Sequence, residues 1–313
     1  MKFGILGEAK IAREWLTPAI IAAGHEVTHI GRRNPGQERL PEIYRGAVET
    51  NYDDLLSESS IDAIYIPLPN HLHVRYSIAA LKAGKHVLCE KPVALNLDEL
   101  SQLENVATTS KLYFQEAFMV RHHPQWHWLQ GLDIGNIQTA HFIFSYPHQL
   151  EGNYRNNSCF GGGPLYDTGC YAILTGCLLF DGTPEVVSAI AKMDDGFDVE
   201  KQIDAVLRWP NGEVLNFTVS SDAALCQSLH VLGDNGWAKL NVPVNPPEVT
   251  HAYWSRGGLN KGERINFPRC NQYKLMIDDF VTQANSGATS DFSASRVITK
   301  TINQIQSMTA ISG

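Results

Sequence analysis

Residues 87–93, V-L-C-E-K-P-V, contain the first side chains whose type and position could do chemistry. A strand rich in Val, Leu and Cys is typical of a parallel sheet that is covered on both faces. Glu90 and Lys91 follow at its carboxyl end, where Pro92 stops the strand. Open α/β sheets bind ligands outside the carboxyl ends of their strands, so Lys91 is a candidate for a ligand-facing cation. A surface salt bridge at a strand end is the alternative interpretation.

A second group lies in residues 161–171, G-G-G-P-L-Y-D-T-G-C-Y, which run into an apolar stretch that predicts a buried helix. Asp167 and Tyr171 are four residues apart, a spacing that predicts both side chains on one face of the first helical turn. Gly169 between them removes a side chain where a flat ring could approach the backbone. The pattern indicates a site, and the alternative is a capping Asp beside a core Tyr.

The elements that must position Lys91 alternate between strand and helix from residue 1 to about residue 118, which predicts a doubly wound parallel sheet. The first strand, residues 2–6, leads through a degraded G-x-A-x-x-A sequence into a helix, the context of a dinucleotide fingerprint. Glu8 is unfavourable in this turn, because its carboxylate competes with a phosphate for the positive electrostatic potential of the helix N-terminus. The predicted cofactor-binding turn comprises Gly7, Glu8, Ala9, Ile11 and Ala12.

The end of the second strand, residues 26–30, bears on which dinucleotide binds. An NAD enzyme usually places an acid here for the ribose 2′-hydroxyl, whereas this chain has Arg32 and Arg33. The fixed fork of an arginine suits a phosphate, so we expect both residues to favour NADP(H), with NAD(H) possible. Two solvated arginines on a loop are the alternative.

The third strand, residues 62–67, ends in a loop that should also reach the cofactor. Pro67 and Pro69 stop the strand, and Asn70 can cap the helix that follows to about residue 84. His73 is a candidate cofactor neighbour, with a packing or capping role as the alternative. Glu90 and Lys91 are expected beside the same cofactor.

The pattern changes after residue 119, where hairpin signals replace the helices. The turns P-N-G at 210–212 and G-D-N-G at 233–236 predict a large open, mainly antiparallel sheet. We therefore expect an α/β chain in two domains: a Rossmann-type domain over residues 1–120, and an α+β domain for substrate and dimerisation over residues 121–313, whose C-terminal helix could pack back on the first. An apolar sheet face should take a partner, which predicts a homodimer. The strands expected in this part are 137–146, 186–193, 203–209, 213–220, 226–232 and 237–240, and the helices are 273–283 and 293–308.

Composition limits the partners. The 313 residues carry a net charge of −8 and no basic run, which disfavours nucleic acid and anionic membranes. The six cysteines form no C-x-x-C pair, and His122, His123 and His127 lack an acid or Cys at ligand spacing, so we predict neither a disulfide framework nor a metal site. No apolar run approaches the ~20 residues of a membrane span and no signal peptide is evident, which indicates a cytoplasmic protein.

Seven segments in order resemble the glucose–fructose oxidoreductase / inositol dehydrogenase (Gfo/Idh/MocA) family. The pattern is most similar to the branch with glucose–fructose oxidoreductase, D-xylose dehydrogenases and dihydrodiol dehydrogenases. The matching segments are G-I-L-G-E-A-K-I-A, I-P-L-P-N-H-L-H, K-H-V-L-C-E-K-P, E-A-F-M-V-R-H-H-P-Q, G-N-Y-R, G-G-G-P-L-Y-D-T-G-C-Y and N-Q-Y-x-x-M-I-D-D-F. The resemblance implies an NAD(P)-dependent oxidoreductase that transfers hydride between nicotinamide and a secondary alcohol or carbonyl of a sugar or cyclic diol. Glu8 departs from the Thr or Ala that is more usual in the branch.

The resemblance also implies roles for individual residues. Lys91 would be the cation that stabilises negative charge developing on the substrate oxygen. Tyr171 would take the proton, and Asp167 would orient Lys91 or bind a substrate hydroxyl. The implied pocket wall comprises Arg121, His123 and Arg155.

Two other functions remain open at this point. One is an enzyme of the same fold that reduces a non-sugar C=C or C=N bond, which would not need Tyr171 for proton transfer. The other is a non-catalytic NADP-binding sensor, which would need none of Lys91, Asp167 and Tyr171.

Overall fold

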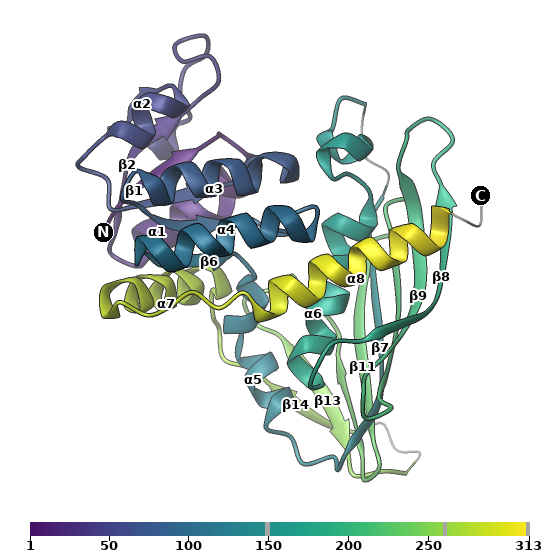
Figure 1. Cartoon of the computed structure of the whole chain (residues 1–313). Coiled ribbons are helices and arrows are strands. Elements are labelled where there is room, and N and C mark those ends of the chain that lie inside the picture. Colours follow the sequence, from purple (N-terminus) through teal and green to yellow (C-terminus); the bar gives the residue numbers. More distant parts are fainter. Residues whose placement is uncertain (148–150, 259–261, 311–313) are drawn as a thin grey trace. The chain divides into compact units, whose positions relative to one another are not determined.

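The computed structural model of the chain describes residues 1–147, 151–258 and 262–310 and divides into two compact units (Figure 1). The first unit contains Met1–Met119 and Asn271–Ser295, and the second contains Val120–Cys270 and Arg296–Gly313. The chain therefore returns to the first unit late, with a segment that we had assigned to the second domain.

The first unit is built on a six-stranded parallel sheet with the order β3-β2-β1-β4-β5-β6. The order reverses between β1 and β4, which is the switch point where doubly wound sheets bind their ligands. The predicted parallel sheet is thus confirmed. Its strands are β1 (Lys2–Leu6), β2 (Glu26–Gly31), β3 (Val48–Thr50), β4 (Ala63–Ile66), β5 (His86–Cys89) and β6 (Phe114–Glu116).

Helices cover both faces of this sheet because its central strands are apolar on both sides. On one face a buried cluster joins β4 and β5 to α3 and α4. On the other face the rings of Phe3 and Phe280 lie 6.0 Å apart, and α7 also packs against α1. The apolar stripe of α7 thus explains why this late helix belongs to the first unit. The helices are α1 (Thr17–Ala22), α2 (Tyr52–Ser57), α3 (His73–Lys82), α4 (Leu97–Ser110) and α7 (Gln272–Ser286).

The second unit is built on an eight-stranded sheet with the order β14-β13-β12-β11-β7-β10-β9-β8. Its pairs are antiparallel except β7 with β10, as expected for a mainly antiparallel sheet. The predicted hairpin at P-N-G forms, and the Trp209 N–H donates to the Glu213 carbonyl across it. The strands are β7 (Ile137–Ser145), β8 (Glu185–Met193), β9 (Glu200–Arg208), β10 (Val214–Ser220), β11 (Cys226–Gly233), β12 (Trp237–Leu240), β13 (His251–Ser255) and β14 (Glu263–Asn266).

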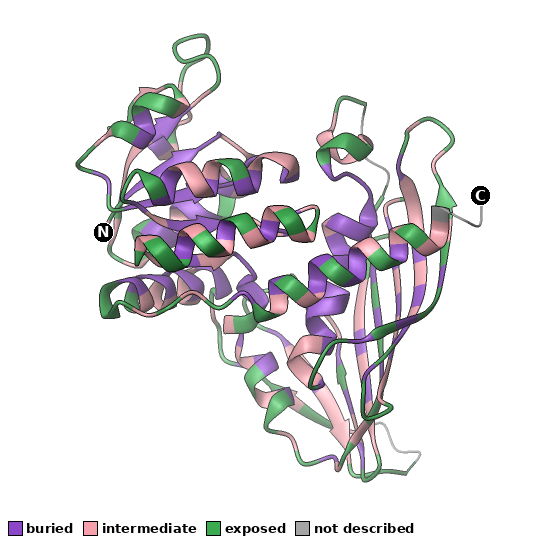
Figure 2. Cartoon of the chain, in the orientation of Figure 1, coloured by how far each residue is buried: buried purple, intermediate pink, exposed green. Residues whose placement is uncertain are grey.

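One face of this sheet is covered by helices of the same unit. Helix α6 (Cys170–Leu179) is buried along its first seven residues, as predicted (Figure 2). The Tyr171 ring lies 6.4 Å from that of Phe144 on β7. The long helix α8 (Ser293–Ala310) lies on the same side of the sheet as α6 (Figure 1). Our reason for expecting a second subunit on the apolar face was therefore wrong, because α6 already occupies that face.

The opposite face of the sheet is mixed in character. Ile143, Thr218, Asp204 and Ile190 lie side by side across β7, β10, β9 and β8. Ile143 and Ile190 are 41% and 70% exposed, whereas the Thr218 hydroxyl donates a 2.5 Å hydrogen bond to Asp204. This face combines exposed apolar side chains with polar ones that are already paired.

Some local expectations differ from the structure. Helix α3 begins at His73 after a 3-10 turn (Asn70–Leu72), and its capping position, Leu72, makes no side-chain hydrogen bond. Asn70 is thus not the cap of α3, because the residues between Pro69 and His73 form this tighter turn. The first helix starts with a π-helical turn (Ala12–Leu16). Strands β3, β13 and β14 were not predicted, since they are short and lack a clear alternation of apolar residues.

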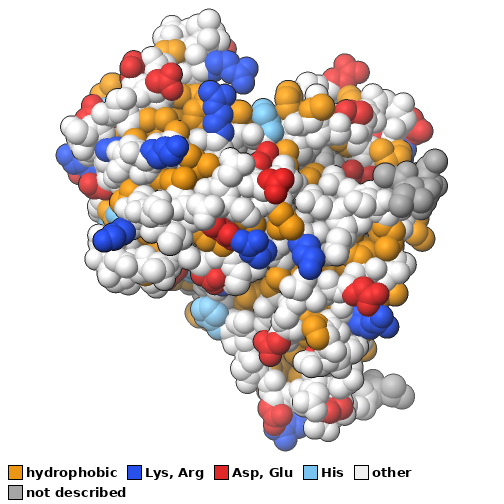
Figure 3. Space-filling model, viewed as in Figure 1, with side chains coloured by type: hydrophobic (Ala, Val, Ile, Leu, Met, Phe, Trp, Pro, Cys, Tyr) orange, Lys and Arg blue, Asp and Glu red, His pale blue; other side chains and the backbone are white. Residues whose placement is uncertain are grey.

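Charged side chains are scattered over the surface. On the face shown in Figure 3, basic residues are interspersed with acidic and apolar ones and form no extended stripe. Within the described residues, no helix is both long and apolar enough to cross a membrane.

Candidate active site

The turn after β1 has the backbone geometry that a close ligand approach requires. Gly7 has a φ of +102°, and its N–H donates to the Gly31 carbonyl at 2.9 Å. A Cβ at Gly7 would lie 2.7 Å from the Leu68 side chain, which follows β4 on the other side of the switch point. Only glycine fits there. Ala9 and Ile11 are partly exposed, whereas Ala12 is fully buried beneath the turn. These residues fit a dinucleotide pyrophosphate.

The two arginines after β2 have different surroundings. The Arg32 guanidinium lies 2.9 Å from the Glu49 carboxylate and 3.1 Å from that of Glu8, and its side chain is 15% exposed. The hydrogen bond that Arg32 donates to Glu49 is the main cause that raises the pKa of Arg32. Arg33 is exposed and makes no ion pair with any residue in the described part of the chain. The two predicted phosphate ligands are therefore not equivalent.

The loop after β4 contains the next predicted residues. Pro67 and Asn70 are buried and Pro69 is partly exposed. The His73 ring is fully buried, with Nδ1 2.8 Å from the Pro92 carbonyl and Nε2 2.6 Å from the Leu68 carbonyl. Burial lowers the pKa of His73 to about 4, although both carbonyls oppose this. His73 thus links the loop after β4 to the loop that contains Glu90, Lys91 and Pro92, which we call the E-K-P loop. Any effect of His73 on a cofactor would be indirect, through the positions of these two loops.

The residues on either side of Lys91 are held by three different elements. The Tyr65 hydroxyl of β4 donates to Glu90 at 2.7 Å, and His73 of α3 contacts the Pro92 carbonyl. The Val93 N–H donates to Glu116 of β6 at 2.8 Å. The half-buried Lys91 therefore follows β5 on a loop with fixed flanks, next to the strand β4 of the switch point.

A buried phenol belongs to the same surroundings. Burial raises the pKa of Tyr273 on α7, the Glu90 charge raises it further, and the Lys91 charge lowers it. Glu116 also accepts a 2.5 Å hydrogen bond from the Ser295 hydroxyl. Sequence reasoning did not identify Tyr65, Glu116 or Tyr273, because nothing local in the sequence relates them to residues 90–93.

In the second unit, two predicted residues form an ion pair. The Arg155 guanidinium donates to the Asp167 carboxylate at 2.8 Å. Burial alone would lower the pKa of Arg155, but the charge and hydrogen bond of Asp167 together with the nearby Tyr154 and Tyr146 outweigh it, so the pKa is raised. Asp167 lies in a π-helical turn (Leu165–Gly169) that continues into α6, where Tyr171 is only 6% exposed. The sequence did not reveal this pairing of Arg155 with Asp167.

A carboxylate that sequence reasoning missed supports the start of this turn. Glu200 on β9 accepts a 2.9 Å hydrogen bond from the Leu165 N–H. Gly163 has a φ of +88°, and a Cβ there would lie 2.4 Å from the same carboxylate. Burial raises the pKa of Glu200 to about 7. No local signal could identify Glu200, which is 35 residues away from Leu165.

The other two predicted pocket residues are involved in local structure. His123 is 1% exposed, and its Nδ1 accepts from the Gln125 N–H at 3.1 Å, which caps α5 (Pro124–Gln130). Burial lowers the pKa of His123 to about 4. Arg121 is exposed, and its carbonyl lies 3.0 Å from the His127 ring.

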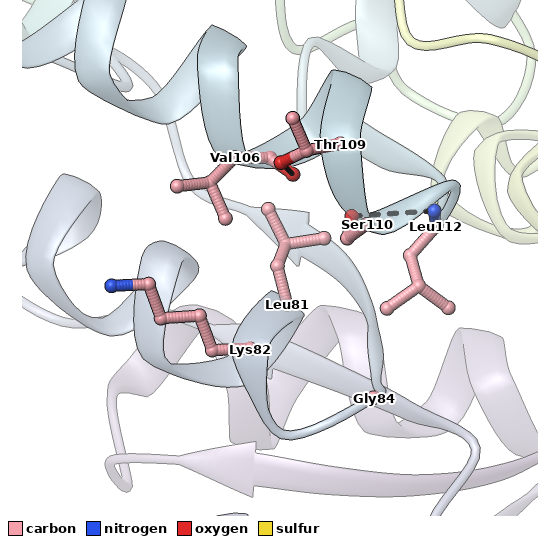
Figure 4. A pocket seen from close by; sticks show the side chains of 7 residues that line it. All are labelled: Leu81, Lys82, Gly84, Val106, Thr109, Ser110 and Leu112. Carbon is pink, nitrogen blue, oxygen red and sulfur yellow. Dashed lines mark hydrogen bonds between the residues drawn. The ribbon is translucent and has the colours of Figure 1, made fainter.

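A surface pocket of about 390 Å³ lies elsewhere in the first unit, between the carboxyl ends of α3 and α4 (Figure 4). Gly84 and Leu112 of its lining precede β5 and β6, so the pocket is at the amino edge of the sheet, opposite to Lys91. The Lys82 side chain extends away from Ser110 and Leu112 in Figure 4. This pocket is not part of the candidate site.

Comparison with known proteins shows similarity over almost the whole chain. A dTDP-3,4-didehydro-2,6-dideoxy-alpha-D-glucose 3-reductase from Actinomadura kijaniata is 31% identical over 92% of this chain and 88% of its own length. A D-xylose 1-dehydrogenase (NADP(+)) from Haloferax volcanii is 29% identical over 92% and 90%. The crystal structure of KijD10, a 3-ketoreductase from Actinomadura kijaniata in complex with NADP and TDP-benzene, matches with a TM-score of 0.90. That match has 27% identity and covers 99% of this chain and 98% of that one.

Two family models match successive parts of the chain. Residues 1–118 match the oxidoreductase family with an NAD-binding Rossmann fold, and residues 127–239 match the GFO/IDH/MocA C-terminal domain. The chain belongs to the GFO/IDH/MocA family of NAD(P)-binding oxidoreductases.

Proposed function

We propose that this oxidoreductase prefers NADP(H) and interconverts a secondary alcohol and a carbonyl group on a sugar, a sugar nucleotide or a cyclic diol. The observation that carries the proposal is the placement of Lys91 after β5, on a loop whose flanking residues are fixed by Tyr65, His73 and Glu116. A cation on a loop with fixed flanks, at the ligand-binding edge of the sheet, is suited to stabilise charge on a substrate oxygen.

The chain's own residues have distinct roles in this proposal. When bound, the nicotinamide accepts or supplies the hydride. Lys91 donates a hydrogen bond to the reacting oxygen, and Tyr171 receives or returns the hydroxyl proton. Asp167 holds the Arg155 guanidinium, which can then hydrogen bond to a further substrate hydroxyl.

The preference for NADP rests on Arg33. It is exposed and has no carboxylate partner among the described residues, so a 2′-phosphate would not have to displace one. Two relatives support this preference, because the Haloferax xylose dehydrogenase is named for NADP(+) and KijD10 was crystallised in complex with NADP.

We propose, in addition, a homodimer. It forms through the face of the eight-stranded sheet that is opposite to α6 and carries Ile143 and Ile190, which we call the open face. The cytoplasmic location stays a prediction from the sequence.

The test is a substrate screen with purified protein, using NADP and NAD with aldoses and trans-dihydrodiols, and NADPH and NADH with dTDP-keto sugars. With the best substrate, we expect Lys91→Ala and Tyr171→Phe each to lower kcat on the order of 100-fold or more, because each removes a group that acts on the transition state. Lys82→Ala, in the pocket of Figure 4, and Tyr253→Phe on β13 are matched controls that should retain full activity.

The outcomes separate the alternatives. Full activity of Tyr171→Phe on a C=C or C=N substrate would favour the non-sugar reductase. Binding of NADPH without turnover of any substrate would favour the sensor.

A further inference from the structure

Glu8 is in the middle of the turn that should accept the cofactor pyrophosphate, where a carboxylate is unfavourable. The structure shows how its charge is offset. Glu8 is only 15% exposed, and its two oxygens lie 3.1 Å from the Arg32 guanidinium and 3.6 Å from that of Arg13. Glu8 is therefore held between two cations within the first unit.

The Arg32 guanidinium is already occupied by protein acceptors. Nη1 donates to the Glu49 carboxylate at 2.9 Å and to the Glu38 carbonyl at 2.7 Å. Nη2 lies 3.1 Å from Glu8 and 3.6 Å from the exposed Glu38 carboxylate. Glu49 is itself fixed, because the Gly36 N–H donates to it at 3.0 Å, and this bond is the main cause that lowers the pKa of Glu49. A 2′-phosphate at Arg32 would meet these carboxylates at short range.

Arg33 differs from Arg32 in its exposure and in its ion pairing. Its side chain is exposed and makes no ion pair with any residue in the described ranges. Its charge acts on Tyr52, where burial raises the pKa of the phenol and Arg33 opposes the rise. The Tyr52 hydroxyl would lie 3.9 Å from a Cβ at Gly7, so Arg33 and the turn have Tyr52 as a common neighbour.

We propose that Arg32 is the counter-cation of Glu8: it neutralises the carboxylate within the turn, so that the pyrophosphate of either dinucleotide can bind. Arg32 is then a positioning residue for the turn and does not select between NADP and NAD. The selection depends on Arg33. The inference rests on dinucleotide binding by the first unit and goes beyond it by separating the roles of two adjacent arginines.

A double-mutant cycle tests this proposal. The dissociation constants of NADPH and NADH are measured by nicotinamide fluorescence for the full chain and for Arg32→Gln, Glu8→Gln and the double variant. Removing Arg32 leaves the Glu8 carboxylate beside the phosphates with only the more distant Arg13 as a cation. We therefore expect Arg32→Gln to weaken both dinucleotides equally, on the order of tenfold or more. The double variant should regain affinity close to that of the wild type, because its turn has no carboxylate to neutralise.

Matched variants keep the test decisive. Arg33→Gln should weaken NADPH and leave NADH unchanged. Arg32→Lys keeps the charge and should change both affinities by the same small factor, which gives a second readout if Arg32→Gln does not fold. Selective loss of NADPH in either Arg32 variant, without rescue by Glu8→Gln, would overturn the proposal and make Arg32 the phosphate ligand. Failure of the wild type to bind either dinucleotide would instead contradict the cofactor site itself.

Discussion

At the scale of single residues, the second unit contains buried groups whose pKa values are shifted from those of the exposed side chains. His123 and Glu200 both support the second unit, as the cap of α5 and as the acceptor for Leu165. Burial lowers the pKa of His123 to about 4 and raises the pKa of Glu200 to about 7. The first residue is thus held as a neutral acceptor, and the second takes up a proton near neutral pH.

These shifts predict opposite pH dependences of stability. Between pH 6.5 and about 4, His123 is protonated in the unfolded chain but not in the folded chain. The contribution of His123 to the free energy of unfolding is therefore lost as the pH falls. Between pH 4.5 and about 7, Glu200 keeps its proton in the folded chain but not in the unfolded chain. The contribution of Glu200 to the free energy of unfolding is therefore lost as the pH rises. Each effect corresponds to at most about 3 kcal/mol in the free energy of unfolding.

Urea unfolding over a pH series measures both effects. We expect His123→Asn, which keeps a capping acceptor, to lose less stability than the wild type as the pH falls from 6.5 to 4. Glu200→Gln, which keeps an acceptor for Leu165, should gain stability relative to the wild type as the pH rises from 4.5 to 7. Curves parallel to the wild type would contradict the assigned pKa directions.

At the scale of elements, α6 positions Tyr171, and its placement depends on a close contact with the β9–β10 hairpin. A Cβ at Gly176 would lie 2.1 Å from the Trp209 ring, which packs 5.1 Å from the ring of Phe180. The absence of a side chain at Gly176 therefore lets the helix and the tryptophan approach each other.

Gly176→Ala tests this contact. Alanine is the better helix former by about 1 kcal/mol. Nevertheless, we expect a net loss of about 1–3 kcal/mol in the free energy of unfolding, since a rigid ring must move. Gly131→Ala at the end of α5 is the control, because a Cβ there would meet its nearest neighbour, the His127 carbonyl, at 3.5 Å. Similar small effects in both variants, measured by urea unfolding, would show that the Trp209 contact is unimportant.

Another element-scale feature is the loop that follows β5. Its neighbours in sequence do not fix it, because its contacts come from β4, α3 and β6. The Glu116 carboxylate, which accepts a hydrogen bond from the Val93 N–H, also accepts one from the Ser295 hydroxyl at the start of α8. The E-K-P loop is therefore a product of the assembled sheet, even though its sequence is recognisable by itself.

At the scale of the whole molecule, the open face of the eight-stranded sheet predicts the assembly state. Ile143 and Ile190 are exposed on the same row of this face, and a homodimer would bury them. We expect light scattering after size exclusion to give twice the 34.7 kDa of one chain. Ile143→Lys with Ile190→Lys should shift the mass to that of a monomer.

The control for this prediction is Ile21→Lys on α1, because Ile21 is 51% exposed in the first unit and should leave the mass unchanged. A wild-type monomer, or a dimer that survives both lysines, would place any assembly surface elsewhere.

Much of this architecture could be predicted from the sequence, because its signals are local. Alternating strands and helices, the turn at Gly7 and the P-N-G hairpin follow from short-range backbone preferences, and the apolar run of α6 follows from its composition. The ordered motifs were sufficient to predict the family. Lys91, Asp167 and Tyr171 became candidates in the same way.

Only the tertiary structure decided which side chains those residues meet. Asp167 pairs with Arg155, Glu200 reaches Leu165 from a distant strand, and α7 returns to the first unit. The environment of Arg32 is the clearest case, because Glu8 reaches it from the turn after β1 and Glu49 reaches it from β3. Sequence reveals the charge of an arginine. Whether that charge is available to a ligand depends on the carboxylates that folding brings within hydrogen-bonding distance.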